Sequence, residues 1–208
     1  MKHINVEQNT DEWHSLRCGK VTASNFGLFM ANDGKAFGDP AKKYAIQIAL
    51  ERITKCQSDS SYTNDHMLRG HEQEPIARML YEETMFVDVA NGGFYDCGLY
   101  GDSPDGLVND DGLIEIKCVT PTTHYATLKR RSFDPAYLWQ LVGHLDCSGR
   151  DWVDFVSYCS SFPEEKQLIV FRLFRNDYID HINRLVTRRN SFLDLIDEIQ
   201  SDICYIGL

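Results

Sequence analysis

Several common sequence signatures are missing from this chain of 208 residues. It has no run of about 18 apolar residues, which excludes a membrane-spanning helix, and residues 1–13 lack the apolar centre of a signal peptide. Its 7 cysteines include no C-x-x-C pair and are odd in number, so neither a disulfide framework nor a cysteine zinc site is indicated. We therefore expect a cytoplasmic protein with reduced thiols and no membrane partner.

Motifs of several enzyme classes are also absent. The histidines show neither H-x-x-x-H nor H-E-x-x-H spacing, which makes a zinc hydrolase a poor interpretation. The glycines form no phosphate-binding P-loop and no dinucleotide fingerprint, and no G-x-S-x-G elbow occurs. ATPase, dehydrogenase and serine hydrolase functions are therefore not favoured.

The composition is that of an ordinary folded protein, with 43% apolar and 25% charged residues. The length fits one domain over residues 1–208. The net charge of −10 by itself argues against a polyanionic partner. It leaves such a partner open, because a nucleic-acid enzyme can concentrate its few cations in one groove.

Acids and one lysine are concentrated in the stretch from Ser103 to Lys117. Residues 110–112, Asp-Asp-Gly, are a strong hairpin-turn signal, and the residues after them alternate as a half-buried strand does. Folding this hairpin would bring Asp105 roughly opposite Glu115. Because side chains at i and i+2 share one face of a strand, Glu115 and Lys117 should point the same way.

Helical patterns flank this hairpin on both sides. The sequence predicts helices over 41–54, 64–83, 121–131, 136–145 and 177–201, strands over 153–159 and 167–174, and a meander of about three strands over 86–112. In helix 64–83 we expect Ile76, Met79 and Leu80 on the buried face, with Pro75 causing a kink or a restart. The predicted fold class is α/β, with a central mixed β-sheet flanked by helices.

Asp105, Glu115 and Lys117 form the pattern P-D-x9-E-x-K. Two converging carboxylates can hold a hard cation such as Mg²⁺, and the lysine can polarise an attacking water or neutralise charge on phosphorus. The alternative is a turn aspartate beside a solvated E-x-K pair. Apolar neighbours on both sides of Glu115 favour the metal site, because buried charges need partners. Glu74 is a candidate third carboxylate, although a lone glutamate on a helix is usually just a solvated residue.

Arg17 and Ser24 are candidates for binding a phosphate. An arginine fork and a serine hydroxyl near helix N-terminal amides both suit such a group. A surface arginine and a helix-capping serine explain the same residues equally well. The sequence pattern leaves the two interpretations open.

These residues occur within a longer ordered series of motifs. The series is E-W-H-S-L-R-C-G-K-V-T-A-S (12–24), G-x-x-x-E-x-x-A (70–77), S-P-D-G-L (103–107), G-L-I-E-I-K-C (112–118), Y-x-x-Q (137–140) and W-x-D-F-V-x-Y (152–158). In this series the chain resembles the phage lambda exonuclease type of the PD-(D/E)XK nuclease superfamily, the exonucleases of viral recombination systems. The resemblance implies a single-domain PD-(D/E)XK fold.

The resemblance also implies a role for each matching residue. Asp105 and Glu115 would bind Mg²⁺ with the backbone carbonyl of Ile116, and Glu74 would contribute to a second metal position, with Mn²⁺ as a possible substitute. Lys117 would orient or activate the water, helped by Gln140. The residues implied to hold a 5′-phosphate end are Arg17, Ser24 and Ser103, and Met67 would be an apolar wedge that splits the duplex end. The loop 31–40 offers Lys35 but no arginine for a contact in the groove.

The implied activity is Mg²⁺-dependent 5′→3′ digestion of linear double-stranded DNA to mononucleotides, leaving a 3′ single strand for recombination. Members of the family are similar in forming ring-shaped homotrimers and in pairing with a single-strand annealing protein. A ring would accommodate the acidic net charge, since only its channel needs to be basic. Two alternatives remain, an endonuclease of restriction or repair type and a non-catalytic module that binds DNA ends.

Overall fold

The computed structural model describes residues 1–57 and 65–205, apart from the side chains of 65–71. Within these ranges the α-helices are α1 (Asp11–Arg17), α2 (Phe26–Met30), α3 (Asp39–Thr54), α4 (Asp65–Met85), α5 (Pro121–Arg130), α6 (Leu138–Ser148) and α7 (Ile179–Tyr205). The strands are β1 (Lys2–Ile4), β2 (Val21–Thr22), β3 (Val89–Asn91), β4 (Phe94–Asp96), β5 (Tyr100–Asp102), β6 (Gly106–Val108), β7 (Gly112–Cys118), β8 (Trp152–Tyr158) and β9 (Leu168–Phe174). Short 3₁₀ helices are η1 (Ala23–Asn25), η2 (Pro135–Tyr137), η3 (Glu164–Lys166) and η4 (Arg175–Tyr178).

The larger of two mixed sheets has five strands in the order β3-β6-β7-β8-β9. Strands β7 and β8 run parallel to each other, and the other three pairs of neighbouring strands are antiparallel. The chain between β7 and β8 contains α5 and α6, which is the kind of crossover that a parallel pair requires. The predicted hairpin is confirmed: β6 and β7 pair antiparallel with Gly106 opposite Ile114 and Val108 opposite Gly112.

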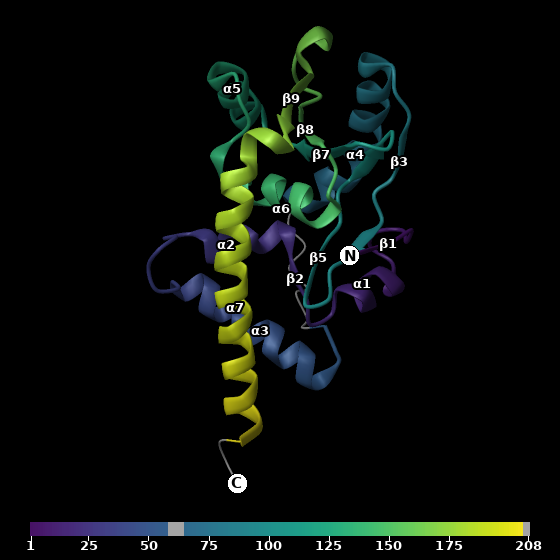
Figure 1. Cartoon of the computed structure of the whole chain (residues 1–208). Helices are drawn as coiled ribbons and strands as arrows, with labels where there is room; N and C mark the ends of the chain where they lie inside the picture. The colour runs from purple at the N-terminus through teal and green to yellow at the C-terminus, as the bar shows by residue number, and fades with distance from the viewer. Residues whose placement is uncertain (58–64, 206–208) are drawn as a thin grey trace.

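The smaller sheet has four strands in the order β1-β4-β5-β2, with β2 parallel to β5. Its strands are only two or three residues long. This sheet lies beside α1 in Figure 1, close to the N-terminus. Its strand β5 ends at Asp102, directly before the segment that carries Ser103 and Asp105.

Helices cover both faces of the five-stranded sheet because the side chains of β7 alternate. Ile114 and Ile116 pack in a cluster with Ala77 and Tyr81 of α4. Leu113, on the other face, belongs to the main core, which also contains residues of α6 such as Leu141. Figure 1 shows α6 on the side of the sheet that faces α7. Glu115 and Lys117 therefore lie on the α6 side, as their i, i+2 spacing from Leu113 requires.

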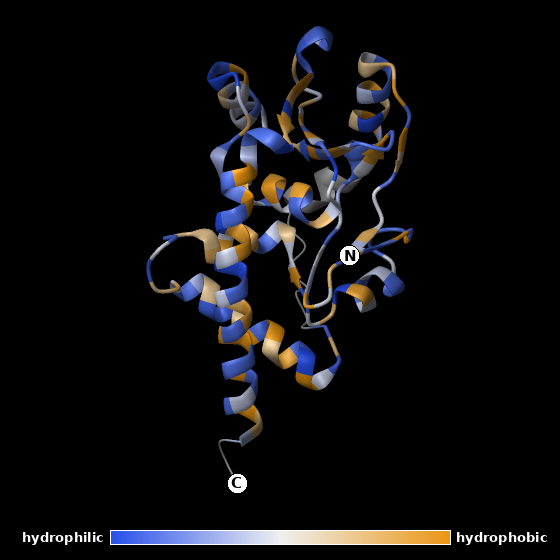
Figure 2. Cartoon of the chain, in the orientation of Figure 1, coloured by the Kyte–Doolittle hydropathy of each residue, from blue (hydrophilic) through white to orange (hydrophobic). Residues whose placement is uncertain are grey.

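The main core continues into a helical region formed by α2, α3 and α7. Its centre is Phe192 of α7, whose ring stacks on Phe29 at a centroid distance of 4.8 Å and on Tyr44 at 6.0 Å. Figure 2 shows orange and blue patches recurring along the ribbon of α7, as expected for a helix with one apolar stripe and one polar face. Within the described residues, no helix combines the length and the apolar content needed to cross a bilayer.

Two glycines permit close approaches that fix the geometry near the site. A Cβ on Gly143 of α6 would stand 2.8 Å from Phe26 and 2.9 Å from Ala23, so the glycine lets α6 pack against η1 and α2. A Cβ on Gly92 would stand 1.7 Å from the carbonyl oxygen of Pro104. The turn that carries Asp105 is thus packed directly on the backbone of residue 92.

Two details of the predicted elements are wrong. Residues 86–112 do not form one meander, because β4 and β5 pair with β1 and β2 in the smaller sheet, while β3 pairs with β6. Among the described side chains of α4, Ala77 and Tyr81 are buried and the predicted Leu80 packs partly buried against them, whereas Ile76 is 48% and Met79 is 54% exposed. The small Ala77 allows the helix to approach the sheet, and the Tyr81 hydroxyl reaches Asp154 at 2.7 Å. Pro75 lies inside α4, which continues through it.

Candidate active site

The β6–β7 hairpin brings Asp105 and Glu115 together. The backbone N–H of Asp105 donates to the carbonyl of Ile114 at 3.1 Å, which extends the pairing one residue beyond the hairpin's register. The Asp105 carboxylate in turn accepts the backbone N–H of Ile116 at 2.6 Å. Ile116 therefore has its backbone at the site, while its side chain points into the opposite core.

Glu115 is 1% exposed, and both oxygens of its carboxylate are hydrogen-bonded. Oε1 accepts from the Gln140 amide at 2.6 Å and pairs with Lys117 Nζ at 2.5 Å. Oε2 accepts from His144 Nε2 at 2.9 Å. Burial acts to raise the pKa of Glu115, but Lys117 and His144 outweigh it and lower the pKa to about 2. Glu115 is therefore a fixed, ionised carboxylate.

Asp105 lies in a different electrostatic environment. Burial and then the charges of Glu115 and Glu74 raise its pKa well above the ordinary value, although Lys117 acts in the opposite direction. Glu74 of α4 lies with Asp105 in the lining of a pocket of about 440 Å³. The structure thus brings together the three predicted carboxylates, with an excess of negative charge around Asp105.

Lys117 is held in its charged form. Burial lowers its pKa, but the carboxylates of Glu115 and Asp105 outweigh burial and raise the pKa above the ordinary value. Its ammonium lies 5.4 Å from the centre of the Tyr137 ring. A charged lysine donates hydrogen bonds and stabilises negative charge.

The charges of this region fit a divalent cation. Four carboxylates (Glu74, Asp102, Asp105 and Glu115) and two cations (Lys117 and His144) leave a net charge of −2 when all are ionised. Carboxylate and backbone carbonyl oxygens are the ligands that Mg²⁺ prefers. In the described part of the chain, no three or more His, Cys, Asp or Glu side chains are already grouped as ligands of one metal ion.

A second group of polar residues lies next to the acids and centres on Ser103. Its hydroxyl oxygen accepts hydrogen bonds from Trp13 Nε1 at 2.9 Å and from Arg17 Nη1 at 3.2 Å. The Arg17 guanidinium lies 4.0 Å from the centre of the Trp13 ring. Burial lowers the pKa of Arg17 despite nearby acids. This arrangement presents a desolvated guanidinium fork, which is suited to an anion.

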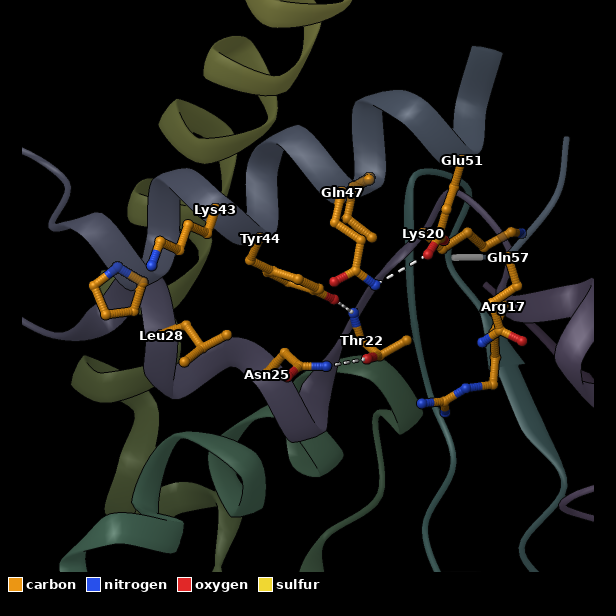
Figure 3. Close-up of a pocket in the computed structure, with 12 residues that line it drawn as sticks. Arg17, Lys20, Thr22, Asn25, Leu28, Lys43, Tyr44, Gln47, Glu51 and Gln57 are labelled. Carbon is orange, nitrogen blue, oxygen red and sulfur yellow. Dashed lines mark hydrogen bonds between the residues drawn. The ribbon is translucent and has the colours of Figure 1, made fainter. Parts of the chain in front are cut away.

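Arg17 also lines a pocket of about 420 Å³ together with residues of η1 and α3. Figure 3 shows its guanidinium pointing along this pocket toward Thr22 and Asn25. Asn25 donates to the Thr22 hydroxyl at 3.1 Å, and the Tyr44 hydroxyl accepts the Thr22 backbone N–H at 3.1 Å. The Ser24 hydroxyl lies 3.3 Å from that of Thr22 and is exposed. The structure therefore places Ser103 against Arg17, whereas Ser24 borders the pocket through Thr22.

The remaining predicted residue, Met67, belongs to α4, but its side chain is outside the described part of the structure. Sequence reasoning missed Trp13, Asp102 and His144. His144 lies four residues after Gln140, on the same face of α6, and this spacing was the available signal.

The helix-flanked mixed sheet and the acid–lysine hairpin at its centre have the architecture of the PD-(D/E)XK nuclease superfamily. Residues 12–151 match the family model described as the YqaJ-like viral recombinase domain. The chain belongs to this family, in agreement with the resemblance seen in its motifs.

Solved structures of similar proteins support this assignment. An alkaline exonuclease from Laribacter hongkongensis is 32% identical, with a TM-score of 0.79 over 95% of this chain and 100% of that one. The same exonuclease in complex with dAMP matches with 33% identity and a TM-score of 0.80, at the same coverage of both chains. A phage-related exonuclease from Haemophilus somnus 129PT shares the fold, at 16% identity and a TM-score of 0.69 over 88% of this chain and 96% of that one. No curated protein matches this sequence.

Proposed function

We propose that this protein is a Mg²⁺-dependent exonuclease that digests linear double-stranded DNA from 5′-phosphorylated ends. One observation carries the proposal. Ser103, which binds Arg17, and Asp105, which faces Glu115, are separated by a single residue. Two residues of extended chain span at most about 7 Å, which is comparable to the separation of neighbouring phosphates on one strand. A terminal phosphate at Arg17 would therefore place the next phosphodiester at the acids, and the product would be a mononucleotide.

The residues that would hold Mg²⁺ are Asp105, Glu115 and the backbone carbonyl of Ile116, with Glu74 at a second metal position. When bound there, Mg²⁺, or Mn²⁺ in its place, would supply Lewis acidity for phosphodiester hydrolysis. The excess negative charge around these side chains and the hard oxygen donors support this choice.

The protein's own groups would perform the remaining tasks. The Lys117 ammonium, beside Glu115, would stabilise the negative charge that develops on the scissile phosphate. Gln140 would hold Glu115 in place through its amide and orient the attacking water with the same group. Arg17 and Ser103 would hold the terminal phosphate, with Ser24 at the border of the pocket.

We also propose the quaternary organisation that the family resemblance implies, a ring-shaped homotrimer that works with a single-strand annealing protein and leaves 3′ single strands for recombination. An apolar stripe on α3 supports self-association: Ile46, Leu50 and Ile53 recur at helical spacing and are 45%, 42% and 37% exposed. In a ring, the cations could line the channel although the chain has a net charge of −10. Sedimentation analysis would show a mass three times 23.9 kDa.

The decisive experiment is a time course of digestion on three DNA substrates. These are a linear duplex with 5′-phosphates, the same duplex with 5′-hydroxyls, and a covalently closed circle, each with and without Mg²⁺. We expect mononucleotides from the phosphorylated duplex only with Mg²⁺, slower digestion of the hydroxyl duplex, and an intact circle. Cleavage of the circle would indicate an endonuclease of restriction or repair type, and no digestion at all would indicate a non-catalytic module for DNA ends.

A further inference from the structure

A buried histidine joins the two sheets behind the acidic site. His144 of α6 is 0% exposed, and each ring nitrogen contacts a carboxylate. Nδ1 lies 2.8 and 2.9 Å from the two oxygens of Asp102, at the end of β5. Nε2 lies 2.9 Å from Glu115 Oε2, in β7. Asp102 is itself 1% exposed, so the three side chains form a continuous buried chain of charged groups.

Nε2 of the His144 ring lies against an oxygen of Glu115, and Nδ1 lies within hydrogen-bond distance of both oxygens of Asp102. The ring therefore links one carboxylate of the larger sheet to one of the smaller sheet. Hydrogen bonds to a charged group are stronger and more directional than neutral ones.

Both oxygens of the Glu115 carboxylate are therefore held by hydrogen bonds. Gln140 and Lys117 bind Oε1, and His144 alone among these donors binds Oε2. Each carboxylate oxygen has two lone-pair sites, so the two donors on Oε1 occupy both of its sites, whereas Oε2 keeps one for a cation. His144 therefore determines the direction in which Oε2 presents its remaining lone pair.

The consequence for Asp102 concerns the region that binds the DNA end. Asp102 directly precedes Ser103, which accepts hydrogen bonds from Trp13 and Arg17. The contacts thus run without a break from Arg17 through residues 102–103 and His144 to Glu115. A residue at the centre of this series can hold the phosphate-binding segment and the metal-binding strand in a fixed relative position.

We propose that His144 is a positioning residue that orients Glu115 for binding a divalent cation, braced by Asp102 on its other side. The inference rests on the proposed function, because it assigns Glu115 to the metal site. The competing explanation is that the buried Asp–His–Glu group only holds the two sheets together. Breaking a buried ionic group destabilises a fold whatever its function, so stability alone cannot distinguish the two explanations.

The test compares two buried histidines. His124 of α5 is also 0% exposed and also bonded at both nitrogens, to the Ser157 hydroxyl at 2.9 Å and the Lys166 carbonyl at 2.8 Å, and neither of these partners is a carboxylate. The variants are His144→Gln and the matched control His124→Gln. The primary readout is the dissociation constant of Mg²⁺ alone, measured by isothermal titration calorimetry without DNA, with Glu115→Gln as the variant that lacks a ligand.

We expect His144→Gln to bind Mg²⁺ about 10- to 100-fold more weakly, the usual effect of removing the partner of a metal ligand. The Mg²⁺ concentration for half-maximal digestion should rise by the same factor. His124→Gln should lower the unfolding temperature and leave the Mg²⁺ constant as in the wild type. An affinity in His144→Gln within twofold of the wild type would overturn the proposal.

A double variant separates the effect on Mg²⁺ binding from a loss of stability. His144→Gln leaves Asp102 charged and partly unpaired, so the double variant Asp102→Asn/His144→Gln removes that charge and should recover stability. Weak Mg²⁺ binding that persists in the double variant supports positioning, whereas recovery of affinity along with stability overturns it. If the wild type binds Mg²⁺ but digests no DNA, the proposed function is wrong. The Mg²⁺ dissociation constants of the variants still decide the role of His144 in that case.

Discussion

The guanidinium of Arg17 and the hydroxyl of Ser103 are 3.2 Å apart, although 86 residues separate them in the sequence. Trp13, one helical turn before Arg17, donates to the same hydroxyl at 2.9 Å. The short helix α1 is thereby connected directly to the segment that leads into Asp105. This connection makes the end-binding and acidic regions parts of one site.

Arg17→Ala should abolish the preference for 5′-phosphorylated ends. Hydrogen bonds to a charged group contribute about 1.5–3 kcal/mol, so digestion of the phosphorylated duplex should fall roughly 10- to 100-fold and approach the rate on 5′-hydroxyl ends. The ratio of the two initial rates is the measurement. Arg184→Ala is the control, because Arg184 is an exposed arginine whose ion pair with Asp33 lies outside the site. An unchanged ratio in Arg17→Ala would contradict the end-binding role.

Lys117→Ala should reduce kcat by at least about 100-fold with little change in KM, because the ammonium acts on charge that develops during the reaction. The fold should persist, since the Lys117 side chain is 26% exposed and its removal leaves Gln140 and His144 on Glu115. Single-turnover digestion with saturating DNA measures the effect, and Lys166→Ala, an exposed lysine of η3, is the control. Digestion by Lys117→Ala at the wild-type rate would rule out the assigned site.

Asp105→Asn should stabilise the metal-free protein while abolishing digestion. The asparagine amide oxygen can still accept the Ile116 N–H, but the like-charge repulsion from Glu115 and Glu74 disappears. About 1 kcal/mol moves Tm by roughly 2–4 °C in a chain of this size, so we expect a rise of a few degrees in EDTA. Calorimetric scans test this, with the exposed Asp111→Asn as control. A lower Tm for Asp105→Asn would show that the charge of Asp105 does not destabilise the metal-free protein.

Asp96 provides a test of pH dependence away from the acidic site. Burial raises its pKa, but the hydrogen bond from Lys20 and that from the Gly98 N–H outweigh burial and lower the pKa below 3.8. A carboxylate with a lowered folded-state pKa contributes stability above its unfolded pKa and loses it as the pH falls further. Asp96→Asn should therefore cost about 0.2–1 kcal/mol at pH 7, and the difference from the wild type should close below pH 3.8. Urea unfolding at several pH values measures the difference in the free energy of unfolding between the two proteins. A difference that does not change with pH would contradict the prediction.

The part of the site that is local in sequence was predictable. The hairpin turn occupies residues 109–111, one residue earlier than predicted, because Gly112 already pairs with Val108 as the first residue of β7. The alternation after it places Glu115 and Lys117 on one face. The roles of Glu74 and Gln140 needed the family resemblance, because a single glutamate or glutamine on a helix carries no signal of its own. The structure adds that Gln140 contacts Glu115 directly.

What sequence reasoning missed depends on contacts between distant segments. Hydropathy favoured Ile76 and Met79 as the buried face of α4, but helix approach and the Tyr81–Asp154 hydrogen bond select Ala77 and Tyr81 instead. The split of the strands into two sheets depends on β1 and β2, which are too short to give a periodic pattern. A buried histidine likewise looks the same in sequence whether its partners are carboxylates, as for His144, or neutral groups, as for His124.

Gly92 lies thirteen residues before Asp105 in the sequence, yet the space for its missing side chain is occupied by the carbonyl of Pro104. In a saturation mutagenesis screen scored by DNA digestion, nearly every replacement at position 92 should be inactive. Such a profile is the one expected of a catalytic residue, although glycine has no side chain that could take part in the reaction. Intolerance at this position would report on the shape of the turn beneath the acids, and a screen interpreted without the structure would assign chemistry to a residue that provides only space.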